Sequence, residues 1–311
     1  MITWIASYPR SGNTLLRIML KEVFGVRTKS KHDDGRSESW RELVGQDPLG
    51  TPWQDALPRL KESQDEHLVK THDGPETNDK CIYVVREPCA AVVSYWHFLR
   101  DIQGVSVPVV AVAAGLCQYG SWSDHVRLWD PLRRRDTLLI RFEDLVASPS
   151  RMIAALGEFL VRDPVGSWDG DIARLRAVDP TFFRSGSNAV NHLEMPSGVR
   201  RVLESICGRE MIEVGYDVGQ ALAEDSQVMG TLIDAAREAV DHWRAVAIER
   251  QSVIDGLEAT CRKRQEVIDL LDAECRERQL IIDRLDIECR RQQEAETSLN
   301  PGSGSPSPKS I

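Results

Sequence analysis

The stretch Tyr8-Pro9-Arg10-Ser11-Gly12-Asn13-Thr14 gathers residue types that can hold an anion. Arg10 supplies a fixed positive charge, and Gly12 lets the backbone approach a ligand closely. Short side-chain donors come from Ser11, Asn13 and Thr14. The phosphate loop of nucleotide hydrolases, GxxxxGK[ST], is absent here because no lysine follows Gly12. Alone, the stretch would suit an ordinary strand–turn–helix corner equally well.

Two further pairs of residues extend this chemistry. Arg86 closes an apolar run and Ser94 follows it, so a cation and a hydroxyl could hold a second phosphate. Lys70 and His72 flank Thr71, and in a strand both would point to the same side. A neutral His72 could accept a proton from a hydroxyl while Lys70 stabilises charge on a transferred group. Each pair alone is more often structural, but together with the loop they favour a group-transfer site.

The elements that must position these residues follow an α/β pattern. Apolar runs predict strands at Ile2 to Ala6, Glu66 to His72, Lys80 to Arg86 and Thr137 to Phe142. Helices are predicted from Thr14, from Cys89 to about Asp101 with Pro88 marking the start, from Ser121 to Arg134, and, after the last strand, through Phe159. Alternating strands and helices indicate a parallel sheet flanked by helices, with ligands outside the carboxyl ends of its strands. Tyr8 to Thr14, Lys70 to His72 and Arg86 each end a predicted strand and so fall there. The polar excursion from Thr28 to Ser63 is predicted to be rich in loops, with short helices.

Composition narrows the class of protein. The 311 residues are 41% apolar, with a net charge of −9, which argues against nucleic acid as a partner. The seven cysteines form no CxxC pair and no metal-ligand spacing, so we expect a reduced compartment and no metal. We expect no leader sequence, since the loop begins almost at Met1. The longest apolar run, Val105 to Leu116, is too short to span a bilayer. A cytoplasmic protein is therefore expected.

The motifs together resemble the PAPS-dependent sulfotransferases of the cytosolic or bacterial soluble type, over residues 1 to about 215 (PAPS is 3′-phosphoadenosine 5′-phosphosulfate). Residues Tyr8 to Thr14 resemble the family's 5′-phosphosulfate loop, and Val69-Lys70-Thr71-His72 resembles the segment with its catalytic base. Tyr83-Val84-Val85-Arg86-Glu87-Pro88 with Ser94-Tyr95-Trp96-His97-Phe98 resembles its 3′-phosphate motif. Further segments occur in the family's order: Tyr119-Gly120-Ser121-Trp122, His125, Trp129, Arg141-Phe142-Glu143-Asp144-Leu145 and Phe183-Arg184-Ser185-Gly186.

The resemblance implies a P-loop-like sulfotransferase fold and transfer of a sulfuryl group from PAPS to a hydroxyl or amine, without a metal. It makes His72 the base, assisted by Lys70 and by Arg10, which replaces the usual loop lysine. The implied cofactor-binding residues are Tyr8, Arg10, Ser11, Gly12, Asn13, Thr14, Arg86, Ser94, Arg184, Ser185 and Gly186. The acceptor stays open between a small molecule, a glycan and a glycolipid. We expect its pocket in the Thr28–Ser63 and Gln103–Gln118 segments.

Some positions depart from the family pattern. Leu15 stands where many members have an adenine-stacking tryptophan, and Phe142 where many have tyrosine. The Arg184 loop lacks the usual tryptophan and lysine. These departures bear on how strongly the cofactor binds. They keep open a second hypothesis, a catalytically degenerate fold that serves as an interaction scaffold. A kinase is a distant third, since no Walker lysine or evident magnesium carboxylate accompanies the loop.

The C-terminal part repeats a fourteen-residue unit three times, over residues 249–290. Fourteen residues are two heptads, which predicts a long helix and coiled coil. Its a and d positions hold Ile254, Leu257, Ile268, Leu271, Ile282 and Leu285, with Cys261, Cys275 and Cys289 at a and Arg264 and Arg278 at d. Half the layers are polar, so the association should be weak, with a second copy or another partner, and a lone solvated helix stays an alternative. The predicted organisation is a domain at 1–225, a helical extension at 226–296 and a disordered tail at 297–311.

Overall fold

The computed structural model describes residues 1–32, 37–170, 172–179, 182–183, 195–218 and 225–299. The predictions for Arg184, Ser185, Gly186 and the tail from residue 300 onward lie outside these described residues. The chain divides into two compact units, Met1–Trp243 and Arg244–Ile311.

The first unit is built on a parallel sheet of five strands in the order β2-β3-β1-β4-β5. The strands are β1 (Ile2–Ser7), β2 (Lys29–Ser30), β3 (His67–Thr71), β4 (Lys80–Val85) and β5 (Thr137–Arg141). Ala6 in the central strand is opposite Thr71 on one side and Tyr83 on the other. The predicted parallel sheet flanked by helices is confirmed. The sequence pattern missed β2, which is only 2 residues long.

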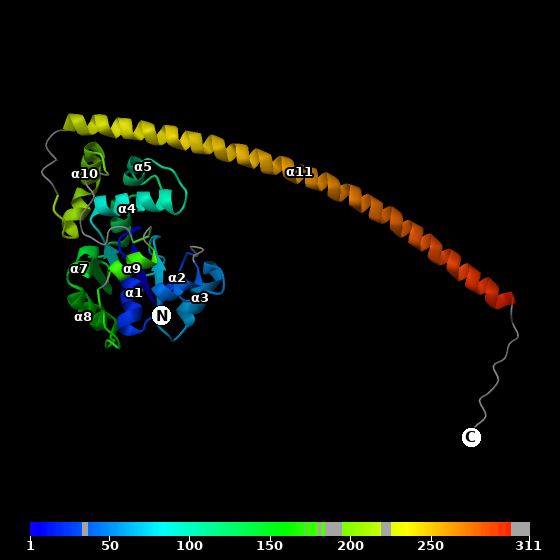
Figure 1. Cartoon of the computed structure of the whole chain (residues 1–311), viewed down its shortest axis with the longest axis horizontal. Coiled ribbons are helices and arrows are strands. Elements are labelled where there is room, and N and C mark those ends of the chain that lie inside the picture. Colours follow the sequence, from blue (N-terminus) through cyan, green and yellow to red (C-terminus); the bar gives the residue numbers. More distant parts are fainter. Residues whose placement is uncertain (33–36, 171, 180–181, 184–194, 219–224, 300–311) are drawn as a thin grey trace, which may run out of the picture. The chain divides into compact units, whose positions relative to one another are not determined.

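Helices cover both faces of this sheet, because alternate side chains of β1 enter separate cores. Trp4 packs in one core and Ile5 in the other, and both side chains are buried. Figure 1 shows α4, α5 and α10 on one side, and α1, α7 and α8 on the other. The first core includes side chains of α3 (Trp53–Glu62), α4 (Pro88–Asp101), α5 (Val109–Ala113), α6 (Trp122–Trp129) and α10 (Ser197–Glu213). The second includes α1 (Asn13–Phe24), α2 (Glu38–Val44), α7 (Phe142–Ala147), α8 (Pro149–Leu160) and α9 (Ile172–Val178).

Two predicted helix extents are wrong. The helix predicted to reach Arg134 ends at Trp129, because Asp130 takes a left-handed backbone with φ of 39°. The region up to Phe159 holds two helices, α7 and α8. They are separated at Ser148, which precedes a proline and has φ of −140° and ψ of 56°.

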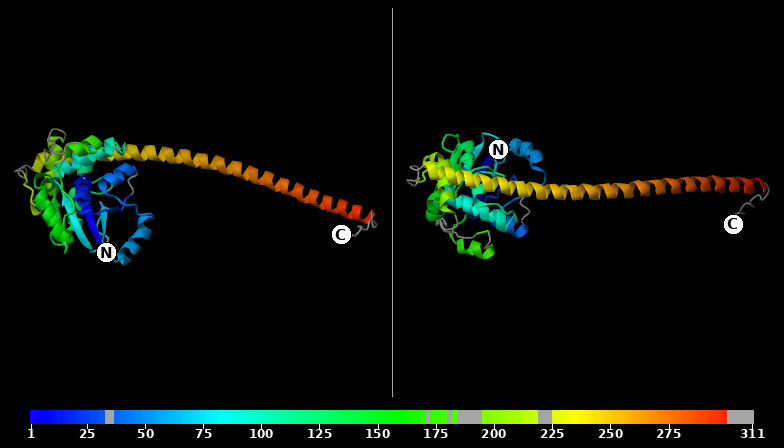
Figure 2. Two further views of the ribbon diagram at one scale, coloured as in Figure 1. Left: turned by 60° about the horizontal axis from the view of Figure 1, so that its bottom comes forward. Right: turned by 90° about the horizontal axis from the view of Figure 1, so that it is seen from above.

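The helix α11 runs without a break from Asp225 to Leu299, a length of 75 residues (Figures 1 and 2). The predicted long C-terminal helix is therefore confirmed, and it extends beyond both predicted ends. The apolar side chains at its a and d positions from Ile254 to Leu285 are exposed in the single chain.

Candidate functional site

The candidate residues meet at one edge of the sheet because most of them lie at or just after the carboxyl end of a parallel strand, while Ser94 reaches the same edge from α4. The Tyr8–Thr14 loop follows β1, His72 follows β3 and Arg86 follows β4. A cavity of about 510 Å³ opens at this edge. Its lining includes eight of the predicted site residues: Arg10, Gly12, Asn13, Thr14, Lys70, His72, Arg86 and Ser94.

Both segments in which the acceptor pocket is expected, Thr28–Ser63 and Gln103–Gln118, contribute to this cavity. His32 and Trp40 come from the Thr28–Ser63 excursion, and Gln103 and Gln118 come from the second segment. Tyr8 and Ser11 do not line the cavity and are buried beneath it.

The backbone of the loop is shaped by Gly12, which caps the amino end of α1 with φ of 110°. A Cβ atom at this position would lie 2.6 Å from Cδ2 of Phe142, so no larger residue fits. No side chain caps α1, which leaves its first N–H groups and the positive end of its dipole at the cavity. The loop therefore has the backbone geometry of an anion site.

Asn13 differs from its predicted role as a ligand donor. Its buried amide Nδ2 donates to the backbone oxygen of Ile5, at 3.0 Å, and to Oγ of Ser7, at 3.3 Å. These bonds fasten the start of α1 to the end of β1. The side chain thus holds the loop in shape, while the Asn13 backbone remains at the cavity.

Two arginines lie side by side in the cavity wall. Arg10 donates from Nε to Oγ of Ser94, at 3.3 Å, and from Nη2 to the oxygen of Phe182, at 2.5 Å. Arg86 donates from Nη1 to the backbone oxygen of Arg10, at 3.2 Å, and its guanidinium lies 4.4 Å from the ring centre of Phe142. Burial lowers the pKa of Arg86. The two predicted anion-binding groups therefore belong to one network around a positively charged wall.

His72 is held in a defined tautomer. Its Nδ1 lies 2.8 Å from the backbone oxygen of Ser7, which can only accept, so Nδ1 carries the hydrogen and Nε2 carries the lone pair. Burial, helped by the charge of Lys70, lowers the pKa of His72 well below its ordinary value of 6.5. The ring of Tyr119 packs edge-on against the imidazole, with centroids 5.5 Å apart. His72 is therefore a neutral imidazole on the cavity wall at neutral pH.

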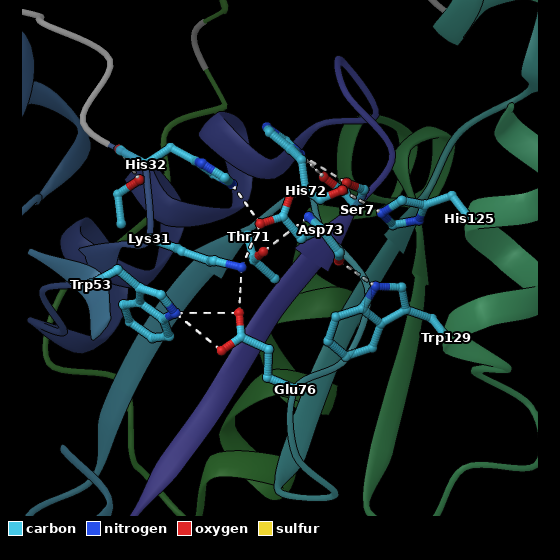
Figure 3. A network of polar contacts seen from close by, with 11 residues as sticks. Ser7, Lys31, His32, Trp53, Thr71, His72, Asp73, Glu76, His125 and Trp129 are labelled. Carbon is cyan, nitrogen blue, oxygen red and sulfur yellow. Dashed lines mark hydrogen bonds and ion pairs between the residues drawn. The ribbon is translucent and has the colours of Figure 1, made fainter. Parts of the chain in front are cut away.

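A second histidine supports the first (Figure 3). Nε2 of His125 donates to the backbone oxygen of His72, at 3.0 Å. Its Nδ1 accepts from the hydroxyl of Tyr83, at 2.7 Å. Burial lowers the pKa of His125 to about 4, so the imidazole stays neutral and keeps this tautomer. The two successive hydrogen bonds, from Tyr83 to His125 and from His125 to the backbone of His72, thus hold that backbone in place.

The turn after His72 is anchored from the other side by Asp73 (Figure 3). Its carboxylate pairs with Nζ of Lys31, at 2.5 Å, and lies 3.3 Å from Nε2 of His32. The Asp73 backbone oxygen accepts from Nε1 of Trp129, at 2.8 Å. Lys31 also pairs with Glu76. These contacts connect the Thr28–Ser63 segment to the end of β3. The sequence pattern did not predict this role.

Sequence reasoning also missed an aromatic pair in the cavity wall, which contacts the loop through Arg10 and Phe182. Trp40 and Phe182 both line the cavity, with ring centroids 4.6 Å apart. The sequence signal was weak, a serine three residues before Trp40 in an otherwise polar segment. In the structure Ser37 caps α2 by accepting from the Trp40 N–H, at 3.3 Å.

Two kinds of feature are absent among the described residues. No cluster of three or more histidine, cysteine or acidic side chains is placed there to hold a metal. Among the same residues, no helix combines the length and apolarity needed to cross a membrane.

Several known proteins are similar to this chain. The family profile described as "Sulfotransferase domain" matches residues 2–168. Mouse Sulfotransferase 1E1 is 31% identical over 178 residues, which cover 51% of this chain and 59% of that protein. Flavonol 3-sulfotransferase of Flaveria bidentis is 27% identical over 185 residues, covering 50% of this chain and 55% of that protein. The chain therefore matches only about six tenths of the length of such relatives.

One solved structure shares the fold. The crystal structure of mouse sulfotransferase SULT7A1 complexed with PAP superposes with a TM-score of 0.50 at 19% identity. The match covers 76% of this chain and 88% of that one.

Proposed function

The chain belongs to the sulfotransferase family, and we propose that it transfers a sulfuryl group from PAPS to an acceptor hydroxyl or amine, with His72 as the base. The observation that carries this proposal is the state of His72. The Ser7 carbonyl holds its Nδ1–H, so a neutral Nε2 is left to accept a proton on the wall of the cavity.

The residues at the sheet edge fit a ligand with two anionic groups. The uncapped start of α1 and Arg10 suit a 5′-phosphosulfate, while Arg86 and Ser94 suit a 3′-phosphate. The hydroxyl of Ser11 is buried beneath the loop with no hydrogen-bond partner in the described part of the chain. Such a group is costly unless a ligand or water satisfies it. PAPS would supply the sulfuryl group, and the mouse SULT7A1 structure in complex with PAP supports this choice.

The side chains would then divide the chemistry between them. Nε2 of His72 would take the proton of the acceptor hydroxyl as its oxygen becomes nucleophilic. Lys70 lines the same cavity and would stabilise the negative charge on the transferred group, together with Arg10. The proposed catalysis consists of positioning and charge stabilisation by these fixed donors.

The walls near the base favour an acceptor with an apolar part. Tyr119 packs on His72, and the ring of Tyr95 lies 6.3 Å from that of Tyr119. Phe98 and Ile102 line the same cavity. We therefore propose a small molecule that carries a hydroxyl on an aromatic or aliphatic body, ahead of a glycan or glycolipid. A cytoplasmic location, where seven free thiols persist, is part of the proposal.

The test has two stages. Calorimetry with 3′,5′-bisphosphoadenosine (PAP) should show binding to the full chain and to His72→Ala alike. Labelled PAPS should then give a sulfated product from a panel of phenols, aliphatic alcohols, amines and oligosaccharides, with the full chain but not with His72→Ala. Failure to bind PAP would contradict the proposal. Binding without transfer to any acceptor would favour the scaffold hypothesis.

A further inference from the structure

The helix α11 carries an apolar seam that repeats with a period of fourteen residues. Within one repeat the seam shows Ile254, Leu257, Cys261 and Arg264 in that order, at successive a and d positions. The same order of residue types recurs fourteen and twenty-eight residues later, except that Gln292 takes the last arginine position. Ile254 is 46% exposed and Leu257 is 61% exposed in the single chain, and the three cysteines are exposed and free. The described part of the helix thus leaves Ile–Leu pairs uncovered at regular intervals.

A parallel, in-register pair of such helices would oppose identical residues. Each Ile–Leu pair would meet its own copy, which is favourable. The arginines at d would also meet their own copies, Arg264 against Arg264 and Arg278 against Arg278. Like charges held face to face in a desolvated seam are unfavourable. The seam therefore disfavours this arrangement.

An antiparallel pair relieves the conflict. Reversing one helix makes a positions face d positions, so that the order Ile-Leu-Cys-Arg meets Arg-Cys-Leu-Ile. With Ile268 opposite the partner's Leu271, every isoleucine of the seam faces a leucine and every cysteine of the seam faces an arginine. No arginine faces another arginine in this register. The layers complement themselves over residues 250–289, about 60 Å of helix.

The flanking e positions agree with the same register. They alternate between glutamine and an acid, as in Gln265 and Asp272. In the antiparallel register each e position lies beside an e position of the other helix, with Asp272 next to the partner's Gln265 and Glu258 next to the partner's Gln279. Acidic side chains thus avoid one another on the flank of the seam.

We propose that α11 binds a second copy of this chain as an antiparallel coiled coil, centred between residues 269 and 270, with Cys275 against the partner's Arg264. This pairing involves only residues of α11, so it does not depend on the proposed sulfotransferase activity. Half of the layers pair an isoleucine with a leucine, and the other half pair a cysteine with an arginine. Because the Cys–Arg layers bury polar groups, the pairing is reversible.

Distances between the natural cysteines test the direction of pairing in the full chain. Two variants each keep one helix thiol for a spin label, Cys261 or Cys289, with the other two changed to serine. In the antiparallel register the two labels should be about 25 Å apart at Cys261 and about 60 Å apart at Cys289, from a rise of about 1.5 Å per residue. A parallel pair would give short distances at both positions and would overturn the proposal. The variant without helix thiols measures any background from the other four cysteines.

Cross-linking tests the register. One chain keeps only Cys275 on the helix, and a second chain has all three helix cysteines as serine together with Arg264→Cys. Co-expressed and mildly oxidised, they should give about tenfold more disulfide-linked dimer than either gives alone, since only the mixed pair is within disulfide reach. Arg278→Cys in place of Arg264→Cys is the matched control and should give no mixed dimer. Equal cross-linking by both variants, or a full chain that scatters light as a 35.0 kDa monomer at high concentration, would refute the pairing.

Discussion

Removal of the Arg86 guanidinium should selectively weaken binding of a 3′-phosphate. The side chain lies over Phe142, contacts the Arg10 carbonyl, and has its pKa lowered by burial, so its charge is poorly solvated in the absence of a ligand. An anion that reaches it would find a partially desolvated donor, for which charge-assisted bonds are strong. We choose Arg86→Met because methionine retains much of the packing on Phe142 and removes the charge.

The expected magnitude follows from the kind of bond that is lost. A hydrogen bond to a charged group contributes about 1.5 to 3 kcal/mol, which corresponds to about 10- to 150-fold in affinity. Calorimetry would compare PAP, which carries a 3′-phosphate, with adenosine 5′-phosphate, which does not. The ratio of the two affinities should fall by this factor. Damage to the loop through the lost Arg10 contact weakens both ligands and cancels in the ratio.

The control is Arg133→Met, which removes an exposed arginine paired with Asp130 and Glu213, away from the cavity. It should leave both affinities unchanged. If Arg86→Met weakens PAP and adenosine 5′-phosphate equally, Arg86 supports the loop and does not hold a 3′-phosphate, and the assignment fails.

Four further outcomes are expected. His72→Ala should lower turnover by about 100-fold or more while PAP binding is kept, as steady-state kinetics and calorimetry would show. Lys70→Met should raise the pKa of His72, measured by NMR, without restoring 6.5, because burial is the larger cause of the shift. Since the pKa of His125 is about 4 when folded and 6.5 when unfolded, stability should fall as pH drops between these values. His125 alone should account for a loss of about 2 to 3 kcal/mol in the free energy of unfolding between neutral pH and pH 4.5, measured by urea unfolding as the difference between the full chain and His125→Gln. Deletion of residues 245 to 311 should leave a folded, PAP-binding protein. Light scattering should show that its oligomeric state is lower than that of the full chain.

The fold was predictable where a buried strand needs a continuous apolar run. β1 and β4 are buried on both faces and stand out in the sequence. β2 has only 2 residues and could not be recognised, because its pairing with β3 is decided by tertiary contacts. The premature end of α6 depends on the backbone angle at Asp130, which residue types do not determine.

The candidate site also contains residues that the sequence predicted and residues that it did not. The anion loop, His72 and Arg86 lie in short motifs at strand ends, so their meeting at one edge followed from the parallel sheet. The contact between Trp40 and Phe182 joins residues far apart in the sequence, and no local spacing indicates it. The structural role of Asn13 was equally hidden, since an amide that bonds the backbone and one that bonds a ligand look alike in a sequence.

The state of the His72 imidazole follows from the pairing of two strands. β1 and β3 run parallel with Ala6 opposite Thr71, so Ser7 at the end of β1 and His72 just after β3 lie side by side. The Ser7 carbonyl accepts Nδ1–H of His72 at this point, which gives the ring one tautomer and directs the lone pair to Nε2. A slip of one residue between the strands would turn every β3 side chain to the other face and remove this bond. The strand register therefore sets the protonation geometry of His72, before any ligand is bound.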